Sequence, residues 1–119
     1  MPCDVEITDE FSKWWGELAM TEQDDTAAIV GLLEKRGPAL GHPYSSAING
    51  SKHSHMRELR IQSGGKPLRV FYAFNPVRNA ILLIGGDKTG DKRFYETFIP
   101  LADRLYEEHL EELRKEGLL

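Results

Sequence analysis

The chain has 119 residues, a length typical of one domain, so we expect a single domain over residues 1–119. Hydrophobic side chains make up 40% of the sequence, but no apolar run approaches the roughly 20 residues of a membrane span, and the net charge of −4 taken alone argues against a nucleic-acid partner. Cys3 is the only cysteine, which excludes an internal disulfide and argues against a cysteine-based zinc site.

The N-terminal residues lack the basic and apolar regions of a secretory signal, so we expect a cytoplasmic protein without a membrane partner.

Residues 3–8 alternate apolar and polar side chains, which predicts a half-buried strand. Thr8 or Asp9 can cap the helix that follows. Its apolar side chains recur at helical spacing and are Phe11, Trp14, Trp15 and Leu18. We interpret this aromatic stripe as core, and Cys3 as a small apolar residue rather than a nucleophile.

A second helix is expected to begin at Thr21, with Asp24 in the position of a capping box. It ends in a basic last turn followed by Gly37 and Pro38, and the two short helices favour an antiparallel hairpin. Residues 37–54 are rich in Gly, Pro, Ser and Asn, which indicates a long loop.

The apolar period then changes to two, which predicts strands over residues 56–62 and 68–74. Residues 80–84 form a continuous apolar run typical of a strand that is buried on both faces. Short turns join the three segments, so we expect an antiparallel meander.

The C-terminal residues predict a helix with one apolar stripe. The stripe consists of Phe94, Phe98, Leu101, Leu105, either His109 or Leu110, and Leu113. Pro100 is expected to kink or restart this helix. Residues 107–112 carry four glutamates and form either a solvated helix face or a surface that docks a basic partner.

Charge is distributed unevenly along the chain. Residues 1–50 hold 3 basic and 9 acidic side chains, residues 51–95 hold 9 and 3, and residues 96–119 hold 3 and 7. The basic middle predicts either a polyanion-binding face or a solvated hairpin rich in Arg and Lys, and charge alone does not decide between them.

His53 and His55 have a spacing that can chelate a metal, but no further Cys or His lies near them in sequence, so we expect no metal site. No Gly-rich phosphate loop is present.

Strand alternation brings three charged side chains together. Glu58 and Arg60 share one face of their strand, and Arg69 shares a face of the next strand with Phe71 and Ala73. An arginine inside so apolar a strand requires an anionic partner. That partner is either Glu58, in a structural salt bridge, or a phosphate, which arginine binds bidentately.

Three stretches of the predicted sheet resemble a known family. Residues 56–60 read Met-Arg-Glu-Leu-Arg, residues 68–74 read Leu-Arg-Val-Phe-Tyr-Ala-Phe, and residues 81–88 read Ile-Leu-Leu-Ile-Gly-Gly-Asp-Lys. This pattern resembles the core of the RelE/ParE superfamily of type II toxin–antitoxin systems, and most closely its HigB-like branch of phage-derived, Gp49-like proteins. The resemblance implies an α+β, RelE-like fold. It consists of an N-terminal strand and a two-helix hairpin packed on an antiparallel sheet of about four strands, with a C-terminal helix kinked at Pro100.

The resemblance also implies a function. It implies a toxin that inhibits translation as a ribosome-dependent mRNA endoribonuclease (an mRNA interferase), in which a ribose 2′-OH attacks the adjacent phosphate without a metal or cofactor. The implied partners are mRNA on the ribosome and a cognate antitoxin, expected to be a helix-turn-helix protein. The implied catalytic residues are Glu58, Arg60, Arg69, Lys88 and Tyr95. The candidate RNA-binding residues are His55, Arg57, Lys66, Lys92 and Arg93.

Two positions depart from the family pattern. Met56 and Glu58 stand where the best-studied branch carries strand lysines. Glu58 is therefore either the general base or a group that neutralises Arg60 or Arg69. Two other functions also stay open on the same fold: a ParE-like toxin that inhibits a protein target such as gyrase, and a non-catalytic module that binds RNA or protein.

Overall fold

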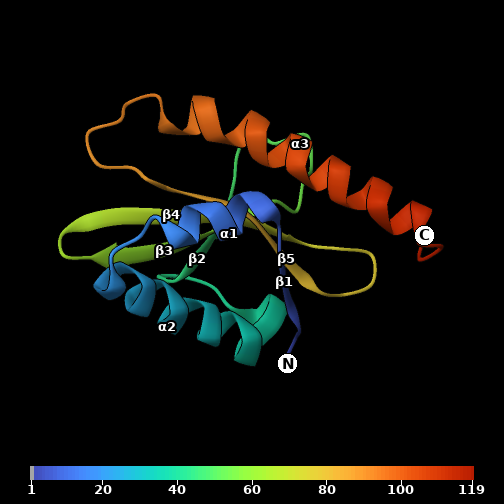
Figure 1. Ribbon diagram of the computed structural model, residues 1–119, viewed down its shortest axis with the longest axis horizontal. Coiled ribbons are helices and arrows are strands. Elements are labelled where there is room, and N and C mark those ends of the chain that lie inside the picture. The colour runs from blue at the N-terminus through green and yellow to red at the C-terminus, as the bar shows by residue number, and fades with distance from the viewer. Residues whose placement is uncertain (1) are drawn as a thin grey trace.

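Five strands form one sheet in the computed structural model, which describes residues 2–119 (Figure 1). The strands are β1 (Val5–Ile7), β2 (Ser45–Ala47), β3 (Arg57–Ser63), β4 (Lys66–Phe74) and β5 (Ala80–Asp87). Their order across the sheet is β1-β5-β4-β3-β2, in which β1 runs parallel to β5 and the other neighbours are antiparallel. The expected meander is confirmed as β3-β4-β5.

Three α-helices cover the two faces of this sheet within residues 2–119. They are α1 (Asp9–Gly16), α2 (Met20–Arg36) and α3 (Phe94–Lys115), and a short 3₁₀ turn, η1 (Gly37–Ala39), follows α2. Helix α1 contacts β5 and α2 contacts β3, whereas α3 contacts β4 and β5. Figure 1 shows α2 and α3 on opposite sides of the sheet. None of these described helices is long and apolar enough to cross a membrane.

Each face of the sheet has its own core, because successive strand side chains point to opposite sides. On the side of α1 and α2 the core includes Phe11, Leu33, Leu59, Ile61, Leu68, Val70 and Tyr72. On the side of α3 it includes Met56, Phe71, Ala73, Leu83, Phe94, Leu105 and Tyr106. The aromatic stripe of α1 thus belongs to the core, as the sequence predicts. Cys3 lies at the edge of the first cluster, where its thiol donates to the carbonyl of Leu33 and burial raises its pKa.

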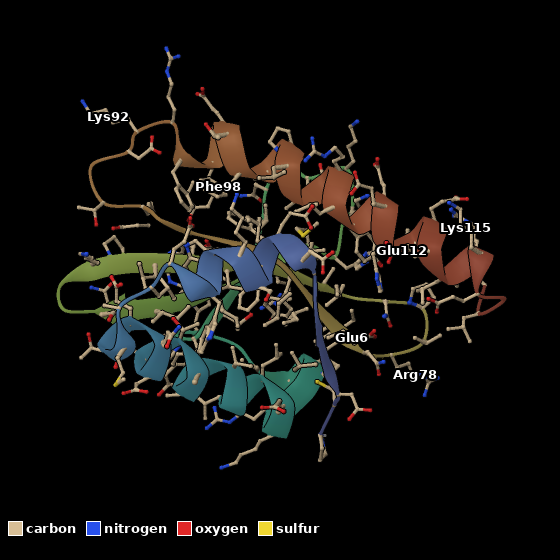
Figure 2. All side chains as sticks on the ribbon, viewed as in Figure 1. Glu6, Arg78, Lys92, Phe98, Glu112 and Lys115 are labelled. Carbon is tan, nitrogen blue, oxygen red and sulfur yellow. The ribbon has the colours of Figure 1, made fainter. Side chains whose placement is uncertain are left out.

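Two glycines of β5 let both helix layers approach the sheet closely. A Cβ on Gly85 would collide with the ring of Trp14, and one on Gly86 would collide with Phe98. Figure 2 shows Phe98 on the sheet-facing side of α3. The absence of a side chain at Gly86 therefore lets the first turns of α3 lie directly against the sheet, and its absence at Gly85 does the same for α1.

The start of α1 agrees with the sequence. The hydroxyl of Thr8, one of the two expected caps, accepts a hydrogen bond from the N–H of Phe11 at 2.9 Å. It also donates to the carbonyl of Leu83 at 2.6 Å, which ties the helix start to β5.

Three expectations need correction. Helix α2 begins at Met20 rather than Thr21, because the carboxylate of Glu22 accepts the N–H of Ala19 at 2.8 Å and caps the helix one residue earlier. The expected loop over residues 37–54 contains η1 and β2, so the sheet has five strands. Helix α3 does not restart at Pro100, and the expected kink is not confirmed. Pro100 and Glu96 are exposed, so water can bond the carbonyl that the proline leaves without a donor.

Candidate active site on the sheet face

Glu58 is the centre of a polar cluster on the sheet face that α3 covers. It lies in β3 and is 4% exposed. One carboxylate oxygen accepts the hydroxyl of Tyr95, from the first turn of α3, at 2.7 Å. The other accepts the hydroxyl of Ser46, from β2, at 3.0 Å. Three separate elements therefore converge on one buried carboxylate.

Two arginines flank this carboxylate. Arg60 and Arg69 face each other across β3 and β4, and their guanidinium nitrogens lie 3.5 and 3.6 Å from the two Glu58 oxygens. The partner that the sequence requires for Arg69 is thus Glu58, in a salt bridge. Two cations share one anion, so the cluster keeps one positive charge in excess.

The two arginines differ in accessibility. The side chain of Arg60 is 39% exposed and can reach a ligand directly. Arg69 is 5% exposed and donates through Nη1 to its neighbour's carbonyl at 3.0 Å. Its Nε is beyond hydrogen-bonding distance of Glu58 and is one of three buried side-chain polar atoms in residues 2–119 without a hydrogen bond. Arg69 therefore retains an unused donor.

Tyr95 and Lys88 complete the cluster. Burial, and then the hydrogen bond to Glu58, raise the pKa of Tyr95, while Arg69 lowers it. The phenol therefore keeps its proton and acts as a donor near neutral pH. The ammonium of Lys88 lies 5.0 Å from the centroid of the Tyr95 ring, within cation–π range.

A hollow of about 310 Å³ opens beside Glu58 and Tyr95. Its other lining residues are Ala47, Ile48, Asn49 and Ile99. It lies between the end of β2 and the first turns of α3. The strand pairing of β4 with β5 shifts by one residue beside Phe71, so a β-bulge lies under this end of the site.

Sequence reasoning missed the residues that β2 and the segment directly after it contribute. Ser46 hydrogen-bonds Glu58, and Ala47, Ile48 and Asn49 line the hollow. All four lie in the segment expected to be a loop. Residues 45–47 read Ser-Ser-Ala and show no alternation of apolar and polar side chains, so the sequence carries no periodic signal for this strand.

Three other residues expected to bind RNA lie away from the cluster. Arg57 lies on the opposite face of β3 and donates to Ser45 at 3.0 Å. Lys66 pairs with Glu22 of α2 at 3.3 Å. His55 contacts the hydroxyl of Tyr106, in the middle of α3, at 3.1 Å.

The remaining two candidates, Lys92 and Arg93, are exposed in the loop before α3. Figure 2 shows Lys92 at the end of the molecule opposite Lys115. This loop leads directly into the turn that carries Tyr95. Both cations therefore lie close to Tyr95 of the cluster in sequence.

A second hollow, of about 380 Å³, borders the C-terminal half of α3 and the start of α1. Its charged or titratable lining residues are Glu6, Asp9, Glu10, Glu108, His109, Glu112 and Glu116. Glu108, Glu112 and Glu116, in or directly after α3, thus face a hollow that does not include Arg60 or Arg69.

The family comparison agrees with this architecture. Residues 13–107 match the family described as "Phage derived protein Gp49-like (DUF891)", which is most of the chain. The chain belongs to this family. The resemblance read from the sequence, to the HigB-like branch of the RelE/ParE superfamily, is thereby confirmed.

This Gp49-like chain is similar to two Mycobacterium tuberculosis proteins that carry toxin names. It is 38% identical over 107 residues to HigB3, covering 89% of this chain and 92% of HigB3. It is 38% identical over 104 residues to HigB2, covering 86% of this chain but 52% of HigB2, so it spans about half the length of that relative.

Two solved structures share the fold of this Gp49-like chain. The toxin RelE of E. coli, a double arginine-to-alanine mutant in the free state, has a TM-score of 0.60 at 12% identity, covering 82% of this chain and 96% of that one. The archaeal RelE–RelB complex from Pyrococcus horikoshii OT3 contains a chain with a TM-score of 0.56 at 16% identity, covering 76% and 99%. These likenesses confirm the RelE-like α+β fold.

Proposed function

We propose that this Gp49-like protein is the toxin of a type II toxin–antitoxin pair and cleaves mRNA on the ribosome. The observation that carries the proposal is the cluster of Glu58, Arg60, Arg69 and Tyr95, which keeps a positive charge beside an open hollow. Its similarity to HigB3 and HigB2, both named as toxins, supports the same assignment.

The proposed reaction is transfer of a phosphate within the RNA. The ribose 2′-oxygen forms a bond to the adjacent phosphorus, the bond to the 5′-oxygen breaks, and the products are a 2′,3′-cyclic phosphate and a 5′-hydroxyl. Arg60 and the unused Nε donor of Arg69 stabilise the charge on the phosphorane. Lys88, at the rim beside Tyr95, gives a proton to the leaving oxygen.

Glu58 takes the proton of the 2′-OH in this proposal. Both of its oxygens are occupied by hydroxyls in the free protein, so Ser46 or Tyr95 must yield when RNA enters. Glu58→Gln separates this role from simple neutralisation of the arginines, because glutamine keeps the shape and removes the basic group. A general base predicts a loss of cleavage of at least about 100-fold with RNA affinity retained or raised.

The deciding experiment follows mRNA integrity in a reconstituted bacterial translation system, with ribosomes present or omitted. We expect cleavage that requires ribosomes and falls at least about 100-fold in Arg60→Ala, because one donor to the phosphorane is lost. Arg60 is half-buried, so this variant is less disruptive than one at Arg69. Arg114→Ala is the matched control, since it lies about 30 Å along α3 from Tyr95.

Intact mRNA with the unmodified protein under both conditions would overturn the endonuclease proposal. It would favour the ParE-like inhibition of a protein target, or a non-catalytic binding module.

We further propose that a helix-turn-helix antitoxin neutralises the protein in the cytoplasm, where its ribosomal substrate is found. The likeness to a chain of an archaeal RelE–RelB complex supports such a partner.

A further inference from the structure

We propose that Ser46 is a positioning residue for the cleavage reaction. It stays bonded to Oε2 of Glu58 when RNA enters, whereas Tyr95 releases Oε1, which then takes the proton of the 2′-OH. This inference rests on the proposed function and decides which of the two hydroxyls yields. The rest of the reaction is unchanged: the 2′-oxygen bonds to phosphorus, and the 5′-oxygen leaves with a proton from Lys88.

The two oxygens of Glu58 have different partners. Oε1 accepts the Tyr95 hydroxyl at 2.7 Å and lies 3.6 Å from Nε of Arg69. Oε2 accepts the Ser46 hydroxyl at 3.0 Å and lies 3.5 Å from Nη1 of Arg60. Each oxygen therefore has one hydroxyl donor and one cation, so the departure of one hydroxyl opens one oxygen and leaves the other covered.

Strand pairing holds Ser46 in place. It lies directly opposite Glu58 in the register of β2 with β3, so the two side chains are neighbours on one face of the sheet. On the other face, the buried Ser45 shares a hydrogen bond with the hydroxyl of Tyr72 at 2.6 Å and accepts one from Nε of Arg57 at 3.0 Å. The strand is thus anchored on both faces, which keeps the Ser46 hydroxyl within reach of Glu58.

Tyr95, in contrast, lies at the opening of the site. Tyr95 and Glu58 both line the hollow of about 310 Å³, whereas Ser46 is not among the described residues that line it. A 2′-OH that arrives through the hollow therefore meets Oε1, the oxygen that the phenol covers. The exchange replaces one hydroxyl donor by another, so the buried carboxylate does not lose a hydrogen bond.

Ser46 also maintains the spacing between Glu58 and Arg60. Hydrogen bonds between a guanidinium and a carboxylate are usually about 2.7–2.9 Å long. Nη1 of Arg60 is farther away, at 3.5 Å from Oε2, and the serine hydroxyl occupies that oxygen. Without the hydroxyl, the 39% exposed side chain of Arg60 can close onto Oε2. Arg60 would then be withdrawn from the phosphate that it stabilises in the proposed reaction.

The test measures cleavage at increasing concentrations of mRNA-bearing ribosomes in the translation system described above. Ser46→Ala should lower kcat at least about tenfold, the loss expected for one hydrogen bond to a charged group, and should change KM by less than about twofold. Ser46→Thr retains the hydroxyl and should restore kcat to within about threefold of the unmodified protein.

Ser54→Ala is the matched control. Ser54 is an exposed serine in the segment between β2 and β3, and within residues 2–119 no hydrogen bond engages its hydroxyl. This variant should cleave mRNA at the rate of the unmodified protein. Circular dichroism verifies that every variant is folded at the assay temperature.

A double variant separates positioning of Glu58 from a general structural effect. Residues that act as a unit have non-additive effects, so Ser46→Ala should lower the residual cleavage of Glu58→Gln by less than about twofold. Full activity of Ser46→Ala, no recovery in Ser46→Thr, or multiplication of the two losses in the double variant would overturn this inference and leave the proposed function standing. Absence of cleavage by the unmodified protein would overturn both.

Discussion

The two hollows along α3 have opposite electrostatic character. At the first turns of the helix, one carboxylate, Glu58, is buried between two guanidinium groups. At the C-terminal half, six carboxylates line a hollow whose described lining includes no Lys or Arg. The net charge of −4 therefore conceals two regions of opposite charge, one beside each end of α3.

The same residue type has different consequences in these two places. The Glu58 carboxylate is desolvated, and its hydroxyl and guanidinium partners replace the water it has lost. The glutamates of the second hollow lie mostly at exposed positions, where water solvates them. Under the proposed function, RNA binds at the first end, and the acidic second end offers no cation to a phosphate.

The largest difference should appear in stability. Glu58→Ala leaves Arg69 as a buried charge without its partner and should lower the free energy of unfolding by about 3 kcal/mol. Glu112→Ala, in the second hollow, removes an exposed charge and should change it by less than about 0.5 kcal/mol. Urea unfolding followed by circular dichroism measures both. Equal effects of the two substitutions would show that the Glu58 cluster is not a buried ionic network.

A smaller difference is expected in RNA binding. The double variant Lys92→Ala/Arg93→Ala should flatten the plot of log Kd against log salt by about 0.7 for each cation that contacts a phosphate. Glu112→Lys and Glu116→Lys, near the far end of α3, should leave the slope unchanged, because ionic screening acts over about 10 Å. Fluorescence anisotropy of a labelled single-stranded RNA between 50 and 200 mM KCl, about the physiological range, provides the measurement. A steeper slope in the lysine variants would mean that RNA also occupies the acidic end.

The sequence predicts those parts of the fold that have long, regular patterns. Alternation identified β3 and β4 and placed Glu58 and Arg60 on one face of their strand, and the strand register of the structure brings Arg69 of β4 next to them. A continuous apolar run identified β5, which is flanked by strands on both sides. Each pattern results from burial of a whole face of a strand, so it stays recognisable despite a local irregularity such as the register shift between β4 and β5.

The sequence could not predict contacts made by short or distant segments. Ser46 reaches Glu58 from a three-residue strand that has no period of its own. The hollow lies between the end of that strand and the first turns of α3, two segments about 50 residues apart in sequence. Arg57 was expected to contact RNA, although alternation already places it on the face opposite Arg60.

The smallest predicted effect compares two tyrosines of α3, Tyr95 at the cluster and Tyr106 in the middle of the helix. Burial raises the pKa of both, and Glu58 raises that of Tyr95 further. A tyrosine whose pKa is raised in the folded state contributes stability below its unfolded pKa of about 10. This contribution is lost as pH rises through the folded pKa, so the free energy of unfolding should decline in strong alkali. Glu58→Gln should move the pKa of Tyr95 back towards its ordinary value and leave Tyr106 unaffected. Spectrophotometric titration of tyrosinate, assigned with Tyr95→Phe and Tyr106→Phe, measures this. An identical Tyr95 titration in Glu58→Gln would mean that the hydrogen bond to Glu58 does not govern this phenol, and that burial alone raises its pKa.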